Sequence, residues 1–336
     1  MGGKKNGTKK NLEKLTPVIE REIARVMPRG KKPDEVYALL WDILDRGGKR
    51  FRPALCLLAC EAVGGKTEKA LPVAAAIELF HNLTLIHDDI EDDSLMRRGK
   101  SCLHVEHGIP LALNAGDGLF IMTLKALLRA KAKPKDVMRI QELLLDAFIG
   151  VLEGQGIELG WHRSGKWDVD EKDYERMVKG KTGVLIGAAC EAGVITGRGS
   201  RRQRKALREF GECIGVAFQI QDDVLNLTGD EKKYKKEIGG DIAEGKRTLM
   251  VIHALRHVKG RKRERLLRLL KRKTRNGEEI KEIIGMFEAL GSIEFAREYA
   301  ERLARKAKGK LGVLDAKKQA TKKLYELADF LIEREV

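Results

Sequence analysis

The sequence predicts an all-α protein, and three observations support that fold class. The chain has only 7 prolines in 336 residues, 35% of its residues are charged, and helix-forming Ala, Leu, Glu, Lys and Arg are abundant. Long segments repeat apolar residues at helical spacing. No alternating run of β-branched residues bounded by turns predicts a strand.

The first ten residues differ from the rest of the chain. Residues 1–10 are polar and basic and are expected to form a disordered tail. Residues 11–336 contain no internal repeat and no linker long enough to separate two domains, so they are predicted to form a single all-α domain. The expected helices cover residues 12–26 (interrupted by Pro17), 34–46, 53–63, 73–98, 110–131, 134–160, 171–197, 202–227, 247–257, 262–273, 277–290, 292–309 and 313–334.

The composition limits the classes of partner and the compartment. The net charge of +16 favours a polyanionic partner, which includes nucleic acid, an anionic membrane surface and phosphorylated small molecules. The five cysteines contain no CxxC pair, Cys56 and Cys60 are expected to be small buried thiols, and a reducing cytoplasm fits this pattern. The polar N-terminus does not resemble a secretory signal, and no uncharged apolar run of about 18–20 residues predicts a transmembrane segment.

Aspartates are concentrated at the end of the most apolar expected helix, in the stretch LIHDDIEDDSLMRRG. Residues four apart share a helix face, so Asp88 is expected beside Asp92 and Asp89 beside Asp93, where like charges repel. A divalent cation would relieve this repulsion, and Mg²⁺ binds one or two carboxylates together with waters and phosphate oxygens. A solvated acidic helix end is the alternative, but the preceding residues LTLI are too apolar for a surface.

A second aspartate pair ends another apolar segment, GVAFQIQDDVLNLTGD. It consists of Asp222 and Asp223, with Asn226 where a third carboxylate would be expected and Asp241 further along the chain. Two such clusters predict facing walls of one cavity, bridged by metal ions and a ligand rich in phosphate.

Basic residues near these clusters predict contacts with phosphate. The turn GGKRFRP places Lys49, Arg50 and Arg52 at a helix start after two glycines, although an ordinary basic turn is an equal alternative. Two further cations, Arg97 and Arg98, follow the first aspartate cluster. Weaker candidates are Lys181 with its neighbour Thr182, Lys236 and Lys246.

In their order and spacing, GGKRFRP, DDIEDDSLMRRG, GKTG and FQIQDDVLNLTGD…GGDIAEGKRT resemble the trans-isoprenyl diphosphate synthases, and in detail the archaeal geranylgeranyl type. The resemblance covers roughly residues 15–335. It implies the isoprenoid-synthase helical bundle around a deep central cavity, usually in a homodimer. The implied activity is a Mg²⁺-dependent prenyltransferase that condenses isopentenyl diphosphate head-to-tail with allylic diphosphates.

The resemblance also implies a role for each motif residue. Three Mg²⁺ ions are expected, two on Asp88, Asp89 and Asp92 and the third on Asp222, with Asp223 and Asp241 in support. The allylic diphosphate would contact Arg97, Lys181, Lys236 and Lys246, and isopentenyl diphosphate would contact Lys49, Arg52, His81 and Arg98. Lys181, Thr182 and Gln219 are the expected catalytic residues, the last two stabilising the allylic cation with their dipoles. Asn226 replaces the last aspartate of the second motif, and its carbonyl oxygen can still bind a metal.

The length of the product is expected to depend on residues just before Asp88. Short-product relatives often carry Phe or Tyr near the positions of Leu83 and Thr84. The medium-sized Leu83 therefore predicts a C20 product, geranylgeranyl diphosphate, with some C15 farnesyl diphosphate. An equal alternative is that Leu83 fills the core and that Phe80, Leu79 or a neighbouring helix sets the length.

Other functions fit parts of the sequence. The nearest alternatives are a synthase of longer polyprenyl diphosphates and a class I terpene cyclase, which would have no use for a second diphosphate site. A His-Asp phosphohydrolase would use His87 and Asp88 but leaves the second aspartate pair unexplained. A zinc site at Cys102, His104 and His107 has no second ligand pair nearby. A nucleic-acid binder is disfavoured because the basic residues are mixed with acids and not with aromatics.

Overall fold

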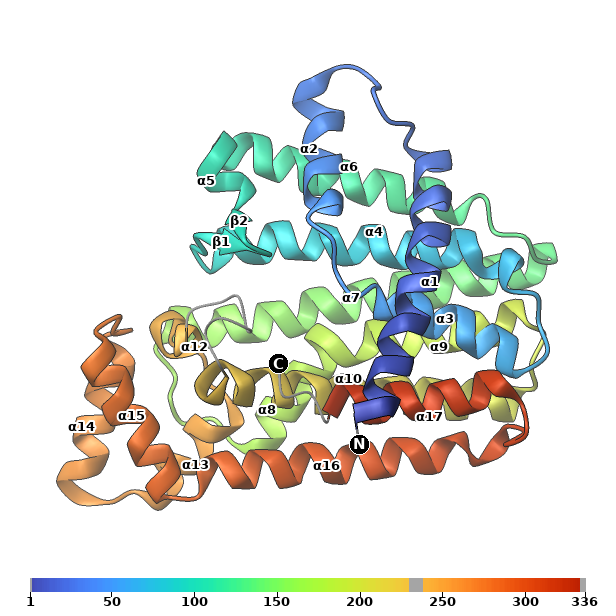
Figure 1. The fold of residues 1–336 in the computed structure, drawn as a ribbon. Helices are drawn as coiled ribbons and strands as arrows, with labels where there is room; N and C mark the ends of the chain where they lie inside the picture. The colour runs from blue at the N-terminus through green and yellow to red at the C-terminus, as the bar shows by residue number, and fades with distance from the viewer. Residues whose placement is uncertain (1, 230–237, 333–336) are drawn as a thin grey trace. The chain divides into compact units, whose positions relative to one another are not determined.

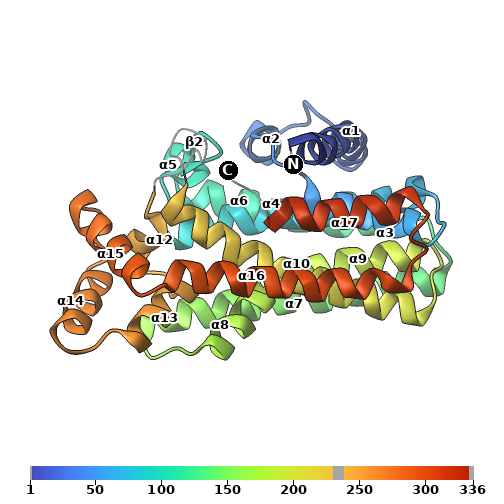
Figure 2. The ribbon, with the colours of Figure 1, turned by 60° about the horizontal axis from the view of Figure 1, so that its bottom comes forward.

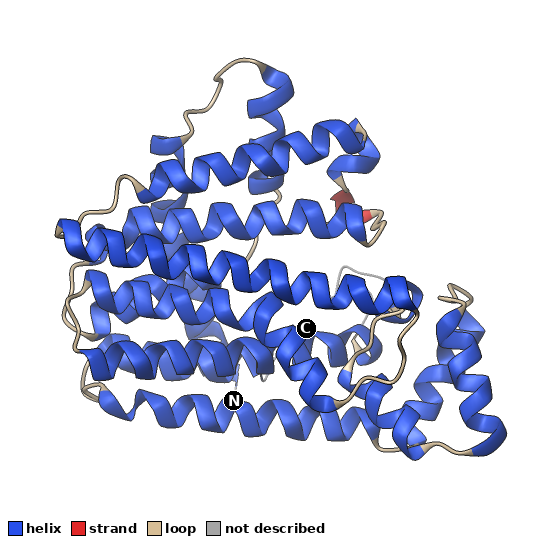
Figure 3. Cartoon of the chain, turned by 180° about the vertical axis from the view of Figure 1, so that it is seen from behind, coloured by secondary structure: helices blue, strands red, loops and turns tan. Residues whose placement is uncertain are grey.

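The computed structural model describes residues 2–229 and 238–332, and helices dominate this part of the chain (Figures 1 and 3). The all-α prediction is confirmed, and the one exception is a short hairpin, β1–β2, whose strands have two residues each. The helices before this hairpin are α1 (Gly2–Val26), α2 (Asp34–Asp45), α3 (Phe51–Ala62) and α4 (Thr67–Glu91). The hairpin is formed by β1 (Met96–Arg97) and β2 (Lys100–Ser101).

The elements after the hairpin are helical throughout the described residues. They are α5 (Leu103–His107), α6 (Ile109–Leu127), α7 (Pro134–Ser164), α8 (Glu171–Val178), the π-helical turn η1 (Lys179–Gly183), α9 (Val184–Thr196), α10 (Arg201–Thr228), α12 (Gly240–Glu244), α13 (Leu249–His257), α14 (Gly260–Lys271), α15 (Gly277–Ala289), α16 (Ser292–Lys310), the 3₁₀ turn η2 (Leu311–Val313) and α17 (Gln319–Ile332).

The chain forms two compact units. Unit 1 comprises residues 1–146, 186–209 and 310–327, and unit 2 comprises residues 147–185, 210–309 and 328–336. The assignment of residues 11–336 to a single domain stays a prediction.

Helix α4 forms the centre of unit 1. It lies alongside α6 and α3, while α1 and α2 cross over these helices (Figures 1 and 2). By length and composition α4 could span a membrane, but 78% of its most apolar stretch is buried inside the structure. It is therefore a core helix, and its residues from Val73 to Leu79 are buried on every side.

The C-terminal end of α4 differs from the sequence prediction. A helix was expected to continue to Arg98, but α4 ends at Glu91 and Asp92 caps it. Asp93 has a φ of 52°, so it lies outside the helix and does not stack on Asp89. The short polar residues after Glu91 favour a turn over helix continuation. As a result, Arg97 and Arg98 lie on the hairpin.

Two further expectations about helix boundaries need correction. The helix expected over residues 171–197 is divided into α8, η1 and α9, because a π-helical turn interrupts it at Lys179–Gly183. Helix α1 contains Pro17 without a break, although an interruption was expected there, and the disordered tail over residues 1–10 stays a prediction.

The core of unit 2 is a separate apolar cluster. It joins α8, the second half of α10 and helices α13 to α16 around fully buried side chains such as Phe287, Leu266 and Ile220. Helix α13 contacts α8, α14 and α15, and α14 and α15 form a helical pair (Figure 2). This cluster holds α8, and with it the start of η1, against α10.

Candidate active site

The first aspartate cluster ends α4 in unit 1. Asp89 is buried (2% exposed) and accepts a hydrogen bond of 2.7 Å from Nε of Arg97. Burial alone would lower the pKa of Arg97, but the hydrogen bond to Asp89 and the negative charges of Asp89 and Asp88 together raise it. Asp88 and Asp92 are half-buried. The hairpin therefore fixes Arg97 beside the cluster, and Asp88 and Asp92 present its more accessible carboxylates.

The carboxylates of the first aspartate cluster suit a hard divalent cation that binds the protein and a substrate at the same time. Among the described residues, no three His, Cys, Asp or Glu side chains are arranged around one point to hold a metal. A structural zinc ion needs four protein ligands, so this finding contradicts a site at Cys102, His104 and His107. Mg²⁺ needs only one or two carboxylates, because waters and phosphate oxygens complete its shell. Asp88 and Asp92 fit that requirement.

Two arginines and a histidine lie at the start of α3, on α4 and on the hairpin, all within unit 1. Nη1 of Arg52 lies 3.1 Å from Nε2 of His81. Nη1 of Arg98 donates a hydrogen bond to the carbonyl of Gly47. The backbone at Gly48 comes so close that a Cβ atom there would lie 2.9 Å from Nη2 of Arg98. Gly48, which has no side chain, therefore leaves room for Arg98 beside the basic residues of the GGKRFRP turn.

Arg50 is not available to a ligand. Its side chain is buried, with Nη1 2.5 Å from Oε1 of Glu78 and Nη2 2.6 Å from the carbonyl oxygen of Leu44. The expectation that Arg50 contributes to a phosphate site is wrong, because Glu78 neutralises it inside the protein. Lys49, the preceding residue, is exposed.

The electrostatics of this group favour an anion. Burial and the positive charges of Arg52 and Arg98 lower the pKa of His81 well below its ordinary value. Burial also lowers the pKa of Arg98 to about 10, although Glu78 acts in the opposite direction. Both shifts show that positive charge is crowded and poorly solvated here, and a bound dianion would relieve that cost.

The second aspartate pair lies on α10 in unit 2, in a chain of hydrogen bonds. Asp223 is buried (5% exposed) and accepts from Oη of Tyr174 at 2.7 Å and from Nε2 of Gln219 at 2.9 Å. Oε1 of Gln219 in turn accepts from the hydroxyl of Thr182 at 3.2 Å. Asp222, the neighbouring aspartate, is only half-buried. The two adjacent aspartates therefore have different environments.

Other carboxylates surround this pair. Burial and the negative charges of Asp241 and Asp222 raise the pKa of Asp223 to about 8. The backbone N–H of Asp241 donates to Oδ1 of Asn226 at 3.0 Å, and Nζ of Lys246 lies 3.5 Å from Oδ1 of Asp241. Asn226 thus anchors the segment that carries Asp241 and Lys246, which is a positional role that needs no charge.

Lys181 is held by a residue that the sequence did not single out. Its Nζ lies 2.7 Å from Oε2 of Glu158 on α7, and Glu158 is 6% exposed. Glycines bring α7 and η1 into direct contact here, because a Cβ atom on Gly154 would lie 2.2 Å from the backbone nitrogen of Lys181. Glu158 and Tyr174 were both missed, since each is an isolated polar residue in an ordinary helical pattern and only its distant partner shows its importance.

The remaining expected residues are placed as follows. Leu83 is buried (7% exposed), and Thr84 is half-buried with its hydroxyl donating to the carbonyl of His81 at 2.8 Å. Lys236 lies outside the described residues. The two aspartate clusters belong to different units, so their position on facing walls of one cavity stays a prediction.

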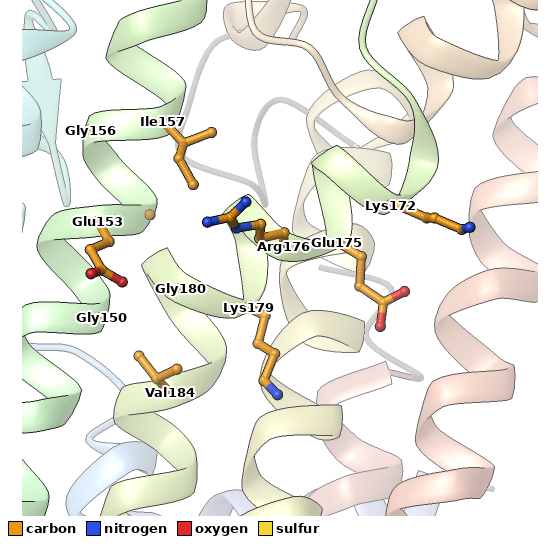
Figure 4. A pocket seen from close by; sticks show the side chains of 11 residues that line it. Gly150, Glu153, Gly156, Ile157, Lys172, Glu175, Arg176, Lys179, Gly180 and Val184 are labelled. Atoms are coloured by element: carbon orange, nitrogen blue, oxygen red, sulfur yellow. The ribbon is translucent and has the colours of Figure 1, made fainter.

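Unit 2 also contains an open pocket of about 740 Å³ between α7, α8 and η1 (Figure 4). Glycines form much of its lining, and the Arg176 side chain extends from α8 toward α7. Lys181, Thr182, Gln219 and Asp222 are not among its lining residues. This pocket is therefore distinct from the expected reaction site.

The geometry agrees with what the chain is similar to. Residues 33–287 match the polyprenyl synthetase family. The chain is also 43% identical over 305 residues to a short chain isoprenyl diphosphate synthase of Methanothermobacter thermautotrophicus, a match that covers 90% of this chain and 91% of the relative.

The chain belongs to the polyprenyl synthetase family.

Solved structures extend the family likeness to the whole fold. Geranylgeranyl pyrophosphate synthetase from Pyrococcus horikoshii superposes with a TM-score of 0.92 at 36% identity, covering 98% of this chain and 99% of that one. Polyprenyl synthase from Caulobacter crescentus, complexed with calcium and isoprenyl diphosphate, has a TM-score of 0.90 at 28% identity, covering 99% and 98%. The isoprenoid-synthase bundle predicted from the motifs is thereby confirmed.

Membership of the polyprenyl synthetase family fixes the class of reaction. The protein is a prenyltransferase, a short-chain isoprenyl diphosphate synthase. The family uses divalent metal ions and acts on isopentenyl and allylic diphosphates. The hypothesis of a His-Asp phosphohydrolase is accordingly wrong.

Proposed function

We propose that this polyprenyl synthetase condenses isopentenyl diphosphate with allylic diphosphates in the presence of Mg²⁺ and releases mainly geranylgeranyl diphosphate. The observation that supports it best is the group of Arg52, His81 and Arg98, which offers an anion site apart from the aspartates. A terpene cyclase has one diphosphate to bind and no need of this second site.

The aspartates are proposed to hold the metal. Two Mg²⁺ ions would bind Asp88, Asp89 and Asp92, and a third would bind Asp222, with Asp223 and Asp241 supporting it. Bound there, Mg²⁺ neutralises negative charge on the allylic diphosphate and makes it a better leaving group. The half-buried carboxylates of Asp88, Asp92 and Asp222 support this assignment.

The cations and dipoles of the chain carry out the remaining tasks. Arg97, Lys181, Lys236 and Lys246 would bind the allylic diphosphate, and Lys49, Arg52, His81 and Arg98 would bind isopentenyl diphosphate. The oxygens of Thr182 and Gln219 would stabilise the allylic cation while apolar surroundings exclude water. The double bond of isopentenyl diphosphate attacks that cation, and the departing diphosphate takes the proton that is lost.

The C20 product is proposed from the side chain at position 83. Leu83 is buried on the core helix α4 about one turn before Asp88, and it is smaller than the aromatic residue of short-product relatives. The Pyrococcus structure, named a geranylgeranyl pyrophosphate synthetase, supports the same length. Longer polyprenyl products remain the alternative.

One incubation series tests these proposals together. The purified protein is supplied with labelled isopentenyl diphosphate and with each of the C5, C10 and C15 allylic diphosphates, with Mg²⁺ or with EDTA. We expect C20 product from all three primers, and none with EDTA. Cyclic hydrocarbons without chain growth would support a terpene cyclase, and a main product longer than C20 would contradict the proposed length.

We also propose that the protein is a cytoplasmic homodimer. Met138, Leu145, Ile149 and Leu152 share one face of α7 and are between 43% and 70% exposed, which is costly for four large apolar side chains. A second copy of the chain would cover them. Light scattering should show a dimer for the wild type and a monomer for the double variant Ile149→Glu, Leu152→Glu; a monomeric wild type contradicts the proposal.

A further inference from the structure

We propose that Tyr174 is a positioning residue that acts through Asp223 to fix the amide of Gln219, with the carbonyl of that amide facing Thr182. This inference rests on the proposed function, in which Gln219 stabilises an allylic cation. It assigns a role to a buried hydroxyl that none of the sequence motifs contains.

The first step concerns Asp223, whose two carboxylate oxygens each accept a hydrogen bond. Oδ2 accepts from Oη of Tyr174 at 2.7 Å and Oδ1 accepts from Nε2 of Gln219 at 2.9 Å. The residue is 5% exposed, so both bonds form away from bulk water, where they are strong and costly to lose. Two opposed donors prevent the carboxylate from rotating.

The second step concerns the direction of the Gln219 amide. A glutamine side chain has a donor end and an acceptor end, and an isolated one can point either way. In the structure Tyr174 occupies Oδ2 of Asp223, and Oδ1 accepts from the NH₂ end of Gln219, so Asp223 selects that end of the amide. The carbonyl Oε1 must then point the other way, and it accepts from the Thr182 hydroxyl at 3.2 Å. With its amide reversed, Gln219 would present N–H groups, which repel a carbocation.

The third step concerns the rigidity of Tyr174. The residue is 2% exposed and belongs to the apolar core of unit 2. Its helix α8 begins with a side-chain cap, in which Asp170 accepts from the backbone N–H of Asp173 at 2.8 Å, and it contacts both α13 and η1. The ring is therefore held by packing, and its hydroxyl is delivered to Asp223 from a fixed place.

The test removes only this hydroxyl. Tyr174→Phe keeps the packed ring, and Tyr299→Phe is the matched control, because Tyr299 also lies in unit 2 and donates to a carboxylate, Oε2 of Glu175, at 2.7 Å. We expect kcat of Tyr174→Phe to fall at least tenfold with KM for isopentenyl diphosphate unchanged. Tyr299→Phe should change kcat less than twofold. Equal kcat in wild type and Tyr174→Phe overturns the proposal.

A double-variant cycle separates positioning from mere stability. If Tyr174 acts through Gln219, adding Tyr174→Phe to Gln219→Leu should lower kcat less than twofold further. A full additional tenfold loss would show that Tyr174 acts elsewhere and would overturn the proposal. The melting temperature of each variant is measured by circular dichroism, and all variants are assayed well below it. A wild type that elongates no allylic diphosphate refutes the proposed function itself, whereas an active wild type with an unaffected Tyr174→Phe variant refutes only this inference.

Discussion

Nζ of Lys181 lies 2.7 Å from Oε2 of Glu158, and this carboxylate is almost completely buried. The pair joins the π-helical turn η1 to α7, and the positive charge of Lys246 also acts on Glu158. Glu158 thus holds one proposed diphosphate ligand in place. Replacing it with Gln leaves the buried end of Lys181 with a weaker acceptor, so we expect kcat for chain elongation to fall at least tenfold in steady-state assays. An unchanged kcat would show that Lys181 needs no such support.

The same pair predicts a pH dependence of stability. Burial alone would raise the pKa of Glu158, but Lys181 and Lys246 hold it below its ordinary value. The folded protein therefore binds this proton more weakly than the unfolded chain. The stabilisation is fully present above the ordinary Glu pKa of about 4.3 and is lost as the pH falls through the lower folded value. The Tm of wild type should exceed that of Glu158→Gln at pH 7, and the difference should shrink toward pH 3. A difference that stays constant over this range would contradict the assignment.

Gly154 should not tolerate a side chain. A Cβ atom there would lie 2.2 Å from the backbone nitrogen of Lys181 and 2.7 Å from the carbonyl carbon of Gly180. Gly154→Ala must push α7 and η1 apart, at a cost of about 1–3 kcal/mol, and should displace Lys181. Calorimetry should show a lower Tm and assays a loss of activity. The control is Gly156→Ala on the same helix, where nothing lies within 4 Å; it should be neutral or stabilise by up to about 1 kcal/mol.

Two arginines of the GGKRFRP turn should have opposite phenotypes. Arg52→Gln removes a proposed ligand of isopentenyl diphosphate, so we expect KM for that substrate to rise roughly tenfold or more with little change in Tm. Arg50→Gln leaves the buried carboxylate of Glu78 without its partner, which costs about 3–5 kcal/mol, so Tm should fall while KM changes little. Steady-state kinetics and thermal unfolding measure both effects. The reverse assignment of phenotypes would show that Arg50 is the ligand.

Leu83 should control the length of the product. Leu83→Phe places an aromatic ring on α4 near Asp88, and chromatography should show a shift from C20 toward C15. Leu79→Phe, one turn earlier on the same helix, is the comparison. If only Leu79→Phe shortens the product, the side chain at position 79 limits chain growth and Leu83 merely fills the core.

Much of the fold and part of the site could be predicted from the sequence. Helical periodicity located most helices within a few residues, because a buried face repeats every three to four positions whatever it packs against. The ends of helices were less predictable. Asp92, Asp93 and Ser94 look compatible with a charged helix surface, yet they end α4 and let the hairpin bring Arg97 to Asp89.

The sequence by itself determined the family, the motif residues and the class of reaction, since these depend on residue types at short, fixed spacings. Only the tertiary structure distinguished residues that look alike in the sequence. Arg50 and Arg52 are two positions apart, yet one is neutralised by Glu78 and the other lies beside His81. Glu158 and Tyr174 became visible only through Lys181 and Asp223, because burial and long-range hydrogen bonds are set by packing between distant segments and leave no local pattern in the chain.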